Sequence, residues 1–160
     1  KAADPSKNKV TWKWLSSDGL DLSGVGVADG GHDLGLCVYD GNEIILSARV
    51  PSFGDCQGPA CWDVDFEKGK VKYRSDDSLP DGIGKLQVTS VDTEQKSLGK
   101  ISVSGKGVAL ALTDSGAPGL ALPVKARLVS SDGEACWEGT FSVPANVKTN
   151  DGGSFKAKSD

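Results

Sequence analysis

The chain contains few residues able to perform acid–base or nucleophilic chemistry. His32 is the only histidine among 160 residues, and it lies in the glycine-rich stretch Asp29-Gly-Gly-His-Asp33. A hydrolytic triad would need this imidazole beside a nucleophile, yet no Gly-x-Ser-x-Gly motif occurs. Ser97-Leu-Gly-Lys100 forms a Ser-x-x-Lys pair, but the partner motifs of the enzymes that use this pair are missing. The sequence therefore predicts no catalytic residues and no enzymatic activity.

Three carboxylates recur at every second position in Asp63, Asp65 and Glu67. In an extended strand they share one face with Cys61. A pair of such carboxylates could serve a glycosidase, and all three could supply part of the about six to eight oxygens that calcium needs. The spacing is not that of an EF-hand, and a polar strand face toward solvent is the simpler interpretation. No cofactor is predicted. Calcium at these three residues is a candidate, and Asp76, Asp77 and Asp81 could supply calcium oxygens instead.

Two tryptophans lie on either side of a lysine near the start of the chain, at Trp12, Lys13 and Trp14. In a strand the two indoles share one face and Lys13 points to the other. Exposed aromatic planes beside polar groups can stack on sugar rings. These three residues are therefore candidate contacts for a polysaccharide or for another protein subunit. The alternative is that both indoles belong to the core or to an interface.

The other two tryptophans lie in a short sequence that occurs twice. Residues 60–66 and 135–141 both read Ala-Cys-Trp-acid-x-x-Phe. In an extended strand the tryptophan and phenylalanine share one face, and the cysteine lies on the other. Each copy thus predicts a strand with its aromatic side in the core. The predicted core residues are Trp62, Phe66, Trp137 and Phe141.

The chain has four cysteines: Cys37, Cys56, Cys61 and Cys136. An even number in a glycine-rich β chain favours disulfides and an oxidising compartment. A four-cysteine zinc site would use short Cys-x-x-Cys pairs, and none is present. Of the possible pairings we favour Cys56–Cys61, which are joined by a Gly-Pro turn, together with Cys37–Cys136.

The composition predicts an all-β fold. Glycine accounts for 21 residues, and no segment concentrates helix formers. The clearest hairpins cover 34–50, 62–74 and 124–141, and Asp-Gly turns occur in the first and third. We expect one antiparallel β-sandwich of about ten strands over residues 10–160, stapled by disulfides, with an irregular β-barrel as the alternative. Residues 1–9 are polar and contain a proline, which predicts an N-terminal arm.

The formal net charge is −4 and the isoelectric point about 5.0. A surface that binds nucleic acid would need clustered cations. Lys68, Lys70, Lys72 and Arg74 share one face of a predicted strand, but Asp76-Asp77 follows at once, so we interpret this stripe as a solvated face. No apolar run approaches the about 20 residues of a membrane span. The predicted partners therefore include neither nucleic acid nor a membrane.

Six short motifs are spread over most of the chain. They are Leu36-Cys-Val-Tyr-Asp-Gly41, Cys61-Trp62, Pro80-Asp-Gly82, Gly105-Lys-Gly107, Cys136-Trp-Glu138 and the closing Phe155-Lys-Ala-Lys-Ser-Asp160. Together they resemble a recurrent Cys-Trp-containing domain of secreted bacterial proteins. The resemblance implies export and a β fold. It supplies no site residues, because that family has no assigned activity. The first residue, Lys1, suits a mature or excised segment.

We therefore expect a non-catalytic module that is secreted and works outside the cell or on its surface. The first expectation is a structural or adhesive role, as in a surface or filamentous assembly. Residues 1–9 and the sheet edges would contact other protein subunits by strand addition. The alternative is a carbohydrate-binding module that holds an extracellular polysaccharide against Trp12 and Trp14.

Overall fold

A computed structural model describes residues 4–25, 31–52, 61–93, 96–112, 120–144, 147–150 and 154–158. This part of the chain is all-β, as the composition predicts, with two single-turn 3-10 segments, η1 (Pro5–Lys7) and η2 (Ser23–Val25). None of its helices has the length and apolar character needed to cross a bilayer. The strands are β1 (Lys9–Ser16), β2 (Leu34–Asp40), β3 (Glu43–Val50), β4 (Trp62–Asp65), β5 (Lys70–Arg74), β6 (Ile83–Thr93), β7 (Lys96–Lys106), β8 (Val124–Ser130), β9 (Cys136–Phe141), β10 (Val147–Asn150) and β11 (Ser154–Lys158).

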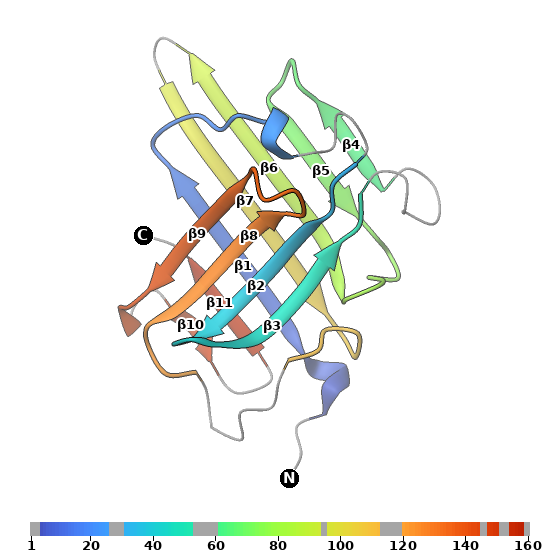
Figure 1. Ribbon diagram of the computed structural model, residues 1–160, viewed down its shortest axis with the longest axis vertical. Coiled ribbons are helices and arrows are strands. Elements are labelled where there is room, and N and C mark those ends of the chain that lie inside the picture. Colours follow the sequence, from blue (N-terminus) through green and yellow to red (C-terminus); the bar gives the residue numbers. More distant parts are fainter. Residues whose placement is uncertain are drawn as a thin grey trace.

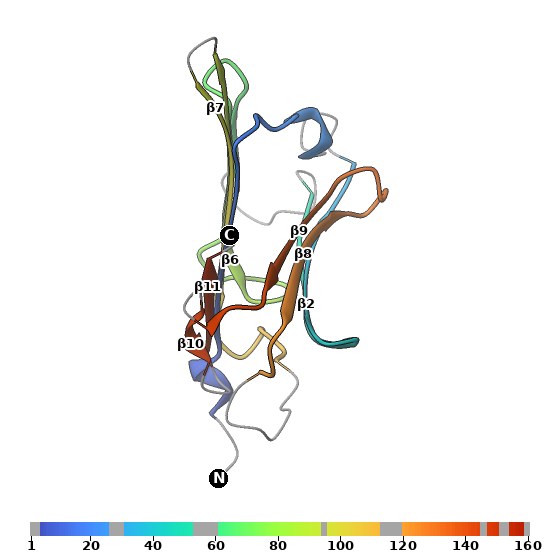
Figure 2. The ribbon, with the colours of Figure 1, turned by 90° about the vertical axis from the view of Figure 1, so that its left-hand side faces the viewer.

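The strands form two sheets (Figure 1). One has seven strands in the order β10-β11-β1-β7-β6-β5-β4, and the other has four in the order β3-β2-β8-β9. Neighbouring strands are antiparallel except for β1 and β11, which run parallel. Figure 2 shows the two sheets as two layers that face each other.

The core lies between the two layers because side chains alternate along each strand. On β2, Leu34, Leu36 and Val38 are buried, and the residues between them are only partly covered. Strands of both sheets and the segment around η2 contribute to a single apolar cluster. Each sheet therefore has one inner face in the core and one outer face.

All three predicted hairpins form. In the hairpin over 34–50, Asp40 pairs with Glu43 across a two-residue loop. The hairpin over 62–74 becomes the β4 edge of the seven-stranded sheet. The hairpins over 34–50 and 124–141 lie side by side, because β2 pairs with β8, and together they make the whole four-stranded sheet.

Three of the four predicted core aromatics pack against the core. Trp62 is 4% exposed, lies against Tyr73 with ring centroids 5.1 Å apart, and donates from Nε1 to the carbonyl oxygen of Pro51 at 3.0 Å. Phe141 is fully buried and Trp137 is half-buried against the same cluster. The prediction is wrong for Phe66, which is 49% exposed. The reason is that β4 ends at Asp65, so Phe66 begins the turn instead of continuing the strand.

The predicted Cys37–Cys136 disulfide is also wrong, because both thiols are free. Cys37 lies on β2 and Cys136 on β9, and β8 runs between these two strands. Two interstrand spacings separate their backbones by at least about 10 Å, and Cys136 is in the row of Gly35 instead of Cys37, so the gap exceeds the roughly 7 Å that a disulfide can bridge. The other predicted bridge includes Cys56, which lies outside the described residues, so that pairing stays a prediction.

The free thiols can be tested by alkylation of the folded protein without reductant. Iodoacetamide should label both Cys37 and Cys136, and Cys136 should react faster because it is the more exposed. Peptide mapping by mass spectrometry locates the labels, and Cys136→Ser should lose one of them. Recovery of a peptide that links Cys37 to Cys136 would contradict the structure.

Two turn glycines make a matched pair for a stability test. Gly41 and Gly69 both have φ of 61°. A Cβ on Gly69 would lie 1.9 Å from the carbonyl oxygen of Ser90, whereas one on Gly41 would meet no atom within 4 Å. Gly41→Ala should lower the free energy of unfolding by about 1–2 kcal/mol, because alanine must adopt the left-handed backbone conformation there.

Gly69→Ala should lower the free energy of unfolding clearly more than Gly41→Ala does. The backbone must move away from Ser90, whose N–H donates to the carbonyl oxygen of Gly69 at 2.8 Å. Urea denaturation of both variants measures the difference in the free energy of unfolding. Equal losses would show that the contact with Ser90 does not constrain this turn.

Candidate functional site

The candidate contacts Trp12, Lys13 and Trp14 do not lie on one surface. Trp12 is fully buried, because β1 is an interior strand of the seven-stranded sheet and its inner face meets the core. Trp14 is half-buried on the same face, and its Nε1 donates to the carbonyl oxygen of Glu138 on β9 at 3.0 Å. Lys13 is exposed on the outer face. Burial thus excludes Trp12 as a surface contact, Trp14 is only partly accessible, and Lys13 is exposed on the opposite face, so a contact through Trp14 or Lys13 stays a prediction.

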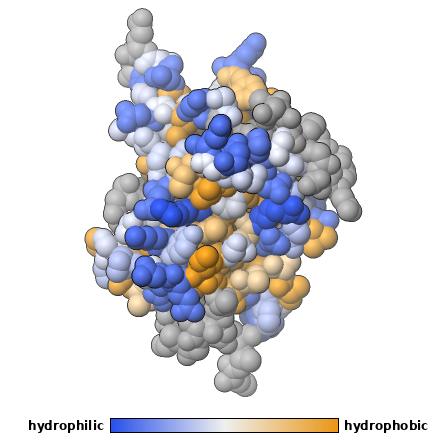
Figure 3. Space-filling view, in the orientation of Figure 1, coloured by the Kyte–Doolittle hydropathy of each residue, from blue (hydrophilic) through white to orange (hydrophobic). Residues whose placement is uncertain are grey.

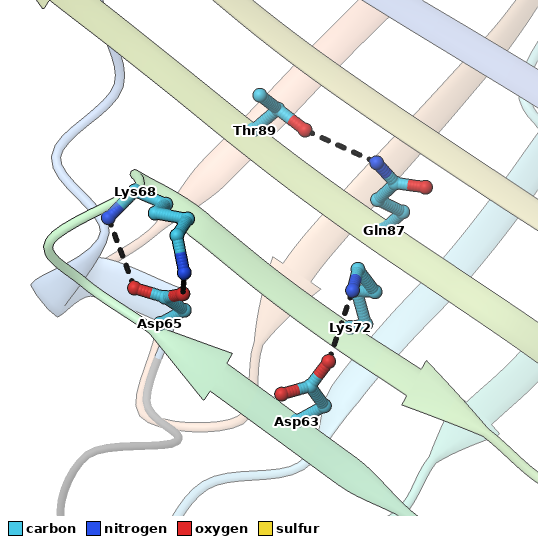
Figure 4. Close-up of polar contacts among 6 residues, drawn as sticks. All are labelled: Asp63, Asp65, Lys68, Lys72, Gln87 and Thr89. Carbon is cyan, nitrogen blue, oxygen red and sulfur yellow. Dashed lines mark hydrogen bonds and ion pairs between the residues drawn. The ribbon is translucent and has the colours of Figure 1, made fainter.

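The candidate calcium residues do not leave free carboxylates on β4. Asp63 lies 2.9 Å from Lys72 Nζ, and Asp65 lies 2.8 Å from Lys68 Nζ (Figure 4). The hydrogen bond from Lys68 lowers the pKa of the Asp65 carboxyl. Glu67 is exposed in the turn that follows. Within the described ranges, no group of three or more His, Cys, Asp or Glu side chains is placed to hold a metal ion.

The outer face of the seven-stranded sheet carries the densest cluster of like charges that we identify. We call the outward-facing side chains of Lys9–Lys13 on β1, Lys70–Arg74 on β5, Lys85–Thr89 on β6 and Lys100–Lys106 on β7 the basic face. Between its cations lie the uncharged polar residues Thr11, Gln87, Thr89, Ser102 and Ser104, some of which are visible in Figure 4. The cations are Lys9, Lys13, Lys70, Lys72, Arg74, Lys85, Lys100 and Lys106.

Most of these cations have no neutralising partner among the described residues. Lys72 pairs with Asp63 at 2.9 Å, and Arg74 pairs with Asp76 at 3.2 Å. The other six form no ion pair with any carboxylate that the structure describes. Because the whole chain has a net charge of −4, positive charge is concentrated on this one face.

Like charges lie directly opposite each other at two places on the basic face. Lys9 of β1 is the register partner of Lys106 of β7, and Arg74 of β5 is the partner of Lys85 of β6. Directly opposed like charges destabilise a sheet. Such local conflicts are expected at functional sites, where a bound partner relieves them. The two pairs therefore indicate a place for an anion.

A pocket of about 350 Å³ lies where these two pairs meet. Its cations are Lys9, Arg74, Lys85 and Lys106, and Asp76 is its one carboxylate. Three hydroxyls also line it, together with two glycines. These hydroxyls belong to Ser75, Ser78 and Ser104. A mixture of ammonium, guanidinium and hydroxyl donors suits an anionic oxygen group such as carboxylate, sulfate or phosphate.

The loop after β5 forms one wall of this pocket and is fixed by its own hydrogen bonds. The Ser75 hydroxyl donates to Asp77 Oδ1 at 2.5 Å, which lowers the pKa of that carboxyl. The backbone N–H of Ser75 donates to the carbonyl oxygen of Gly84 at 3.0 Å. Ser78 is buried and has φ of 57°, held by a hydrogen bond from its N–H to Ser75 Oγ. The wall is therefore built before any ligand arrives.

The outer face of the four-stranded sheet has a different character. Figure 3 shows hydrophobic residues between hydrophilic ones on this side of the molecule. Arg127 on β8 pairs with Glu138 on β9, which raises the pKa of the guanidinium. His32 lies beside this sheet, with Nε2 3.4 Å from Asp132 Oδ2. Charges here are mostly compensated in pairs.

Sequence reasoning found only part of the basic face. The stripe of Lys70, Lys72 and Arg74 is visible in the sequence, and we interpreted it as a solvated face. The remaining cations come from strands far apart in the chain, and only the pairing of β1 with β7 and β6 with β5 brings them together. The available signal was the recurrence of lysine at even spacings in the segments of β1, β5 and β7, whereas β6 contributes Lys85 alone.

Comparison with known proteins finds no family model, no curated protein and no solved structure that matches this chain. The resemblance to a domain of secreted bacterial proteins therefore gains no support from them. Any function has to be argued from the geometry of the chain itself.

The opposed cations predict that loss of either lysine stabilises the fold. Lys85→Gln and Lys106→Gln should each raise the free energy of unfolding by a few tenths of a kcal/mol at low ionic strength, within the roughly 0.2–1 kcal/mol range of cross-strand pairs. In about 1 M salt the gain should shrink, because screening removes the repulsion.

Lys125→Gln is the matched control for these two variants. Lys125 is exposed in a strand as well, but its cross-strand neighbours Tyr39 and Thr140 are uncharged. Urea denaturation at two salt concentrations should show no comparable gain for this variant. A loss of stability in both Lys85→Gln and Lys106→Gln would contradict the repulsion.

Proposed function

We propose that this chain is a non-catalytic adhesive module, a β-sandwich that works outside the cell and holds an anionic partner against its basic face. The observation that carries the proposal is the pocket between the two opposed cation pairs, Lys9 with Lys106 and Arg74 with Lys85. Three of these four cations have no ion-pair partner among the described residues, and Asp76 compensates only Arg74, so their repulsion would lower the stability of the fold while the pocket is empty. A bound anion would offset the repulsion between these cations and form charge-assisted hydrogen bonds with them.

Adhesion through the face fits the described residues better than strand exchange through an N-terminal arm. Asn8 is buried, and its Nδ2 donates to the carbonyl oxygen of Leu110 at 2.9 Å. The N–H of Gly107 donates back to the carbonyl oxygen of Asn8 at 2.9 Å. Asp4 accepts a hydrogen bond from the Ser6 N–H and caps η1. The end of the expected arm thus binds its own domain.

The sheet edges are also poor sites for adding a strand from a second molecule. Strands β4 and β10 have only four residues each. On β9, the carbonyl oxygen of Glu138 already accepts the Trp14 indole N–H. On β3, the Arg49 N–H donates to Asp81 Oδ2 at 2.8 Å, and Leu46 forms an isolated bridge with Leu112. Short and occupied edges limit edge-to-edge pairing.

Retention on a sulfopropyl cation-exchange matrix at pH 7 tests the proposal. A chain with net charge −4 should flow through if its charge were evenly spread, so retention at low salt reports the basic face. The double variant Lys85→Gln/Lys106→Gln should elute at clearly lower salt than the wild-type chain. The measured quantity is the salt concentration at the elution peak.

The control double variant is Lys7→Gln/Lys125→Gln, which removes the same charge from residues outside the pocket and outside the four strands of the basic face. Lys7 lies in η1, 3.9 Å from Asp4, and Lys125 lies on the four-stranded sheet. This control should elute close to the wild-type position. The proposal would be wrong if the wild-type chain flowed through the column, or if both double variants lowered the salt concentration at the elution peak equally.

A further inference from the structure

The pattern of charges on the basic face specifies the partner more closely than its sign alone. Along one row across the sheet, Lys72, Gln87, Ser102 and Lys13 are successive register partners on β5, β6, β7 and β1. In the next row, Lys70 and Lys100 lie on either side of Thr89. In these two rows the cations are therefore about 10–15 Å apart, which is two or three interstrand spacings, whereas Arg74 and Lys85 are direct neighbours in the row that borders the pocket.

The positions between the cations are filled by hydroxyl and amide groups. Thr11, Ser102 and Ser104 make no side-chain hydrogen bond to any residue that the structure describes, so their hydroxyls are available to a partner. A suitable partner offers hydroxyls between widely spaced anionic groups. A linear polysaccharide with carboxylate or sulfate groups has this chemistry.

We propose that the basic face binds a linear acidic polysaccharide that runs across β5, β6, β7 and β1, with one of its anionic groups in the pocket between Arg74, Lys85 and Lys106. This inference rests on the proposed function and names the partner. The polymer crosses the strands, since the rows of alternating cations and hydroxyls run in that direction.

A nucleic acid fits this surface less well than a polysaccharide does. Single strands are held by aromatic side chains on which the bases stack. The described outward positions of β1, β5, β6 and β7 carry no aromatic residue, because Trp12, Trp14 and Tyr73 face inward. A duplex carries about one charge per 1.7 Å of helix axis without interruption, whereas uncharged side chains separate the cations in the two rows above, and the net charge of −4 opposes a duplex.

Biolayer interferometry with four immobilised polymers tests the inference at one low ionic strength. The probes are polygalacturonate, chondroitin sulfate, neutral dextran and a double-stranded oligonucleotide. The wild-type chain should bind polygalacturonate or chondroitin sulfate and leave dextran unbound. The relative affinity for these two probes distinguishes a carboxylated from a sulfated polymer, and binding to either supports the inference.

The residues substituted for this experiment lie outside the pocket. Their loss therefore tests whether the bound polymer extends beyond the pocket across the basic face. Lys13→Gln/Lys100→Gln should weaken binding to the acidic polysaccharide about tenfold, the combined effect of two exposed charge contacts. Lys7→Gln/Lys125→Gln, with the same net charge, should bind like the wild-type chain. Equal weakening by both double variants would overturn the inference.

The remaining outcomes separate this inference from the proposed function. If the oligonucleotide binds as tightly as the acidic polysaccharides, the inference of a polysaccharide partner is wrong, but the proposed function, binding of an anionic partner, still holds. If the chain is retained on the sulfopropyl matrix but binds neither acidic polysaccharide, the inference of a polysaccharide partner is again wrong and the proposed function still holds. If the chain neither binds a polysaccharide nor is retained, both the inference and the proposed function are wrong.

Discussion

The pairing of β1 with β7 is the constraint on which both the core and the basic face depend. All eight residues of β1 have register partners on β7, from Lys9 opposite Lys106 to Ser16 opposite Gly99. Alternation along β1 buries Trp12 and presents Lys13 to solvent. A shift of the register by one residue would exchange these two faces, so the apolar inner face holds the cations in place.

Local patterns in the sequence were enough to predict the hairpins but not how they associate. Alternation and the Asp-Gly turns identify the hairpins over 34–50 and 124–141 because both signals are short-range. Nothing local indicates that β2 pairs with β8, or that β1 lies between β7 and β11. For the same reason the cysteine pairing failed at Cys37, since a connectivity depends on which strands are neighbours.

The site was harder to predict than the fold because its residues are individually ordinary. Exposed lysines on strands are common, and Lys70 or Lys85 alone carries no signal. The tryptophans drew attention instead, yet Trp12 is buried in the core and Trp14 binds the carbonyl oxygen of Glu138. The information lies in register partners such as Arg74 and Lys85, which the linear sequence does not show.

The two free thiols lie on the side of the domain away from the basic face. Cys37 and Cys136 occupy outward positions of the four-stranded sheet, and the cations occupy outward positions of the other sheet. Because the two sheets face each other as layers, these surfaces point in opposite directions (Figure 2). A molecule held by a polymer on one side would present its thiols on the other. A chemical label attached at Cys136 would therefore lie on the layer opposite the cations and leave the basic face uncovered.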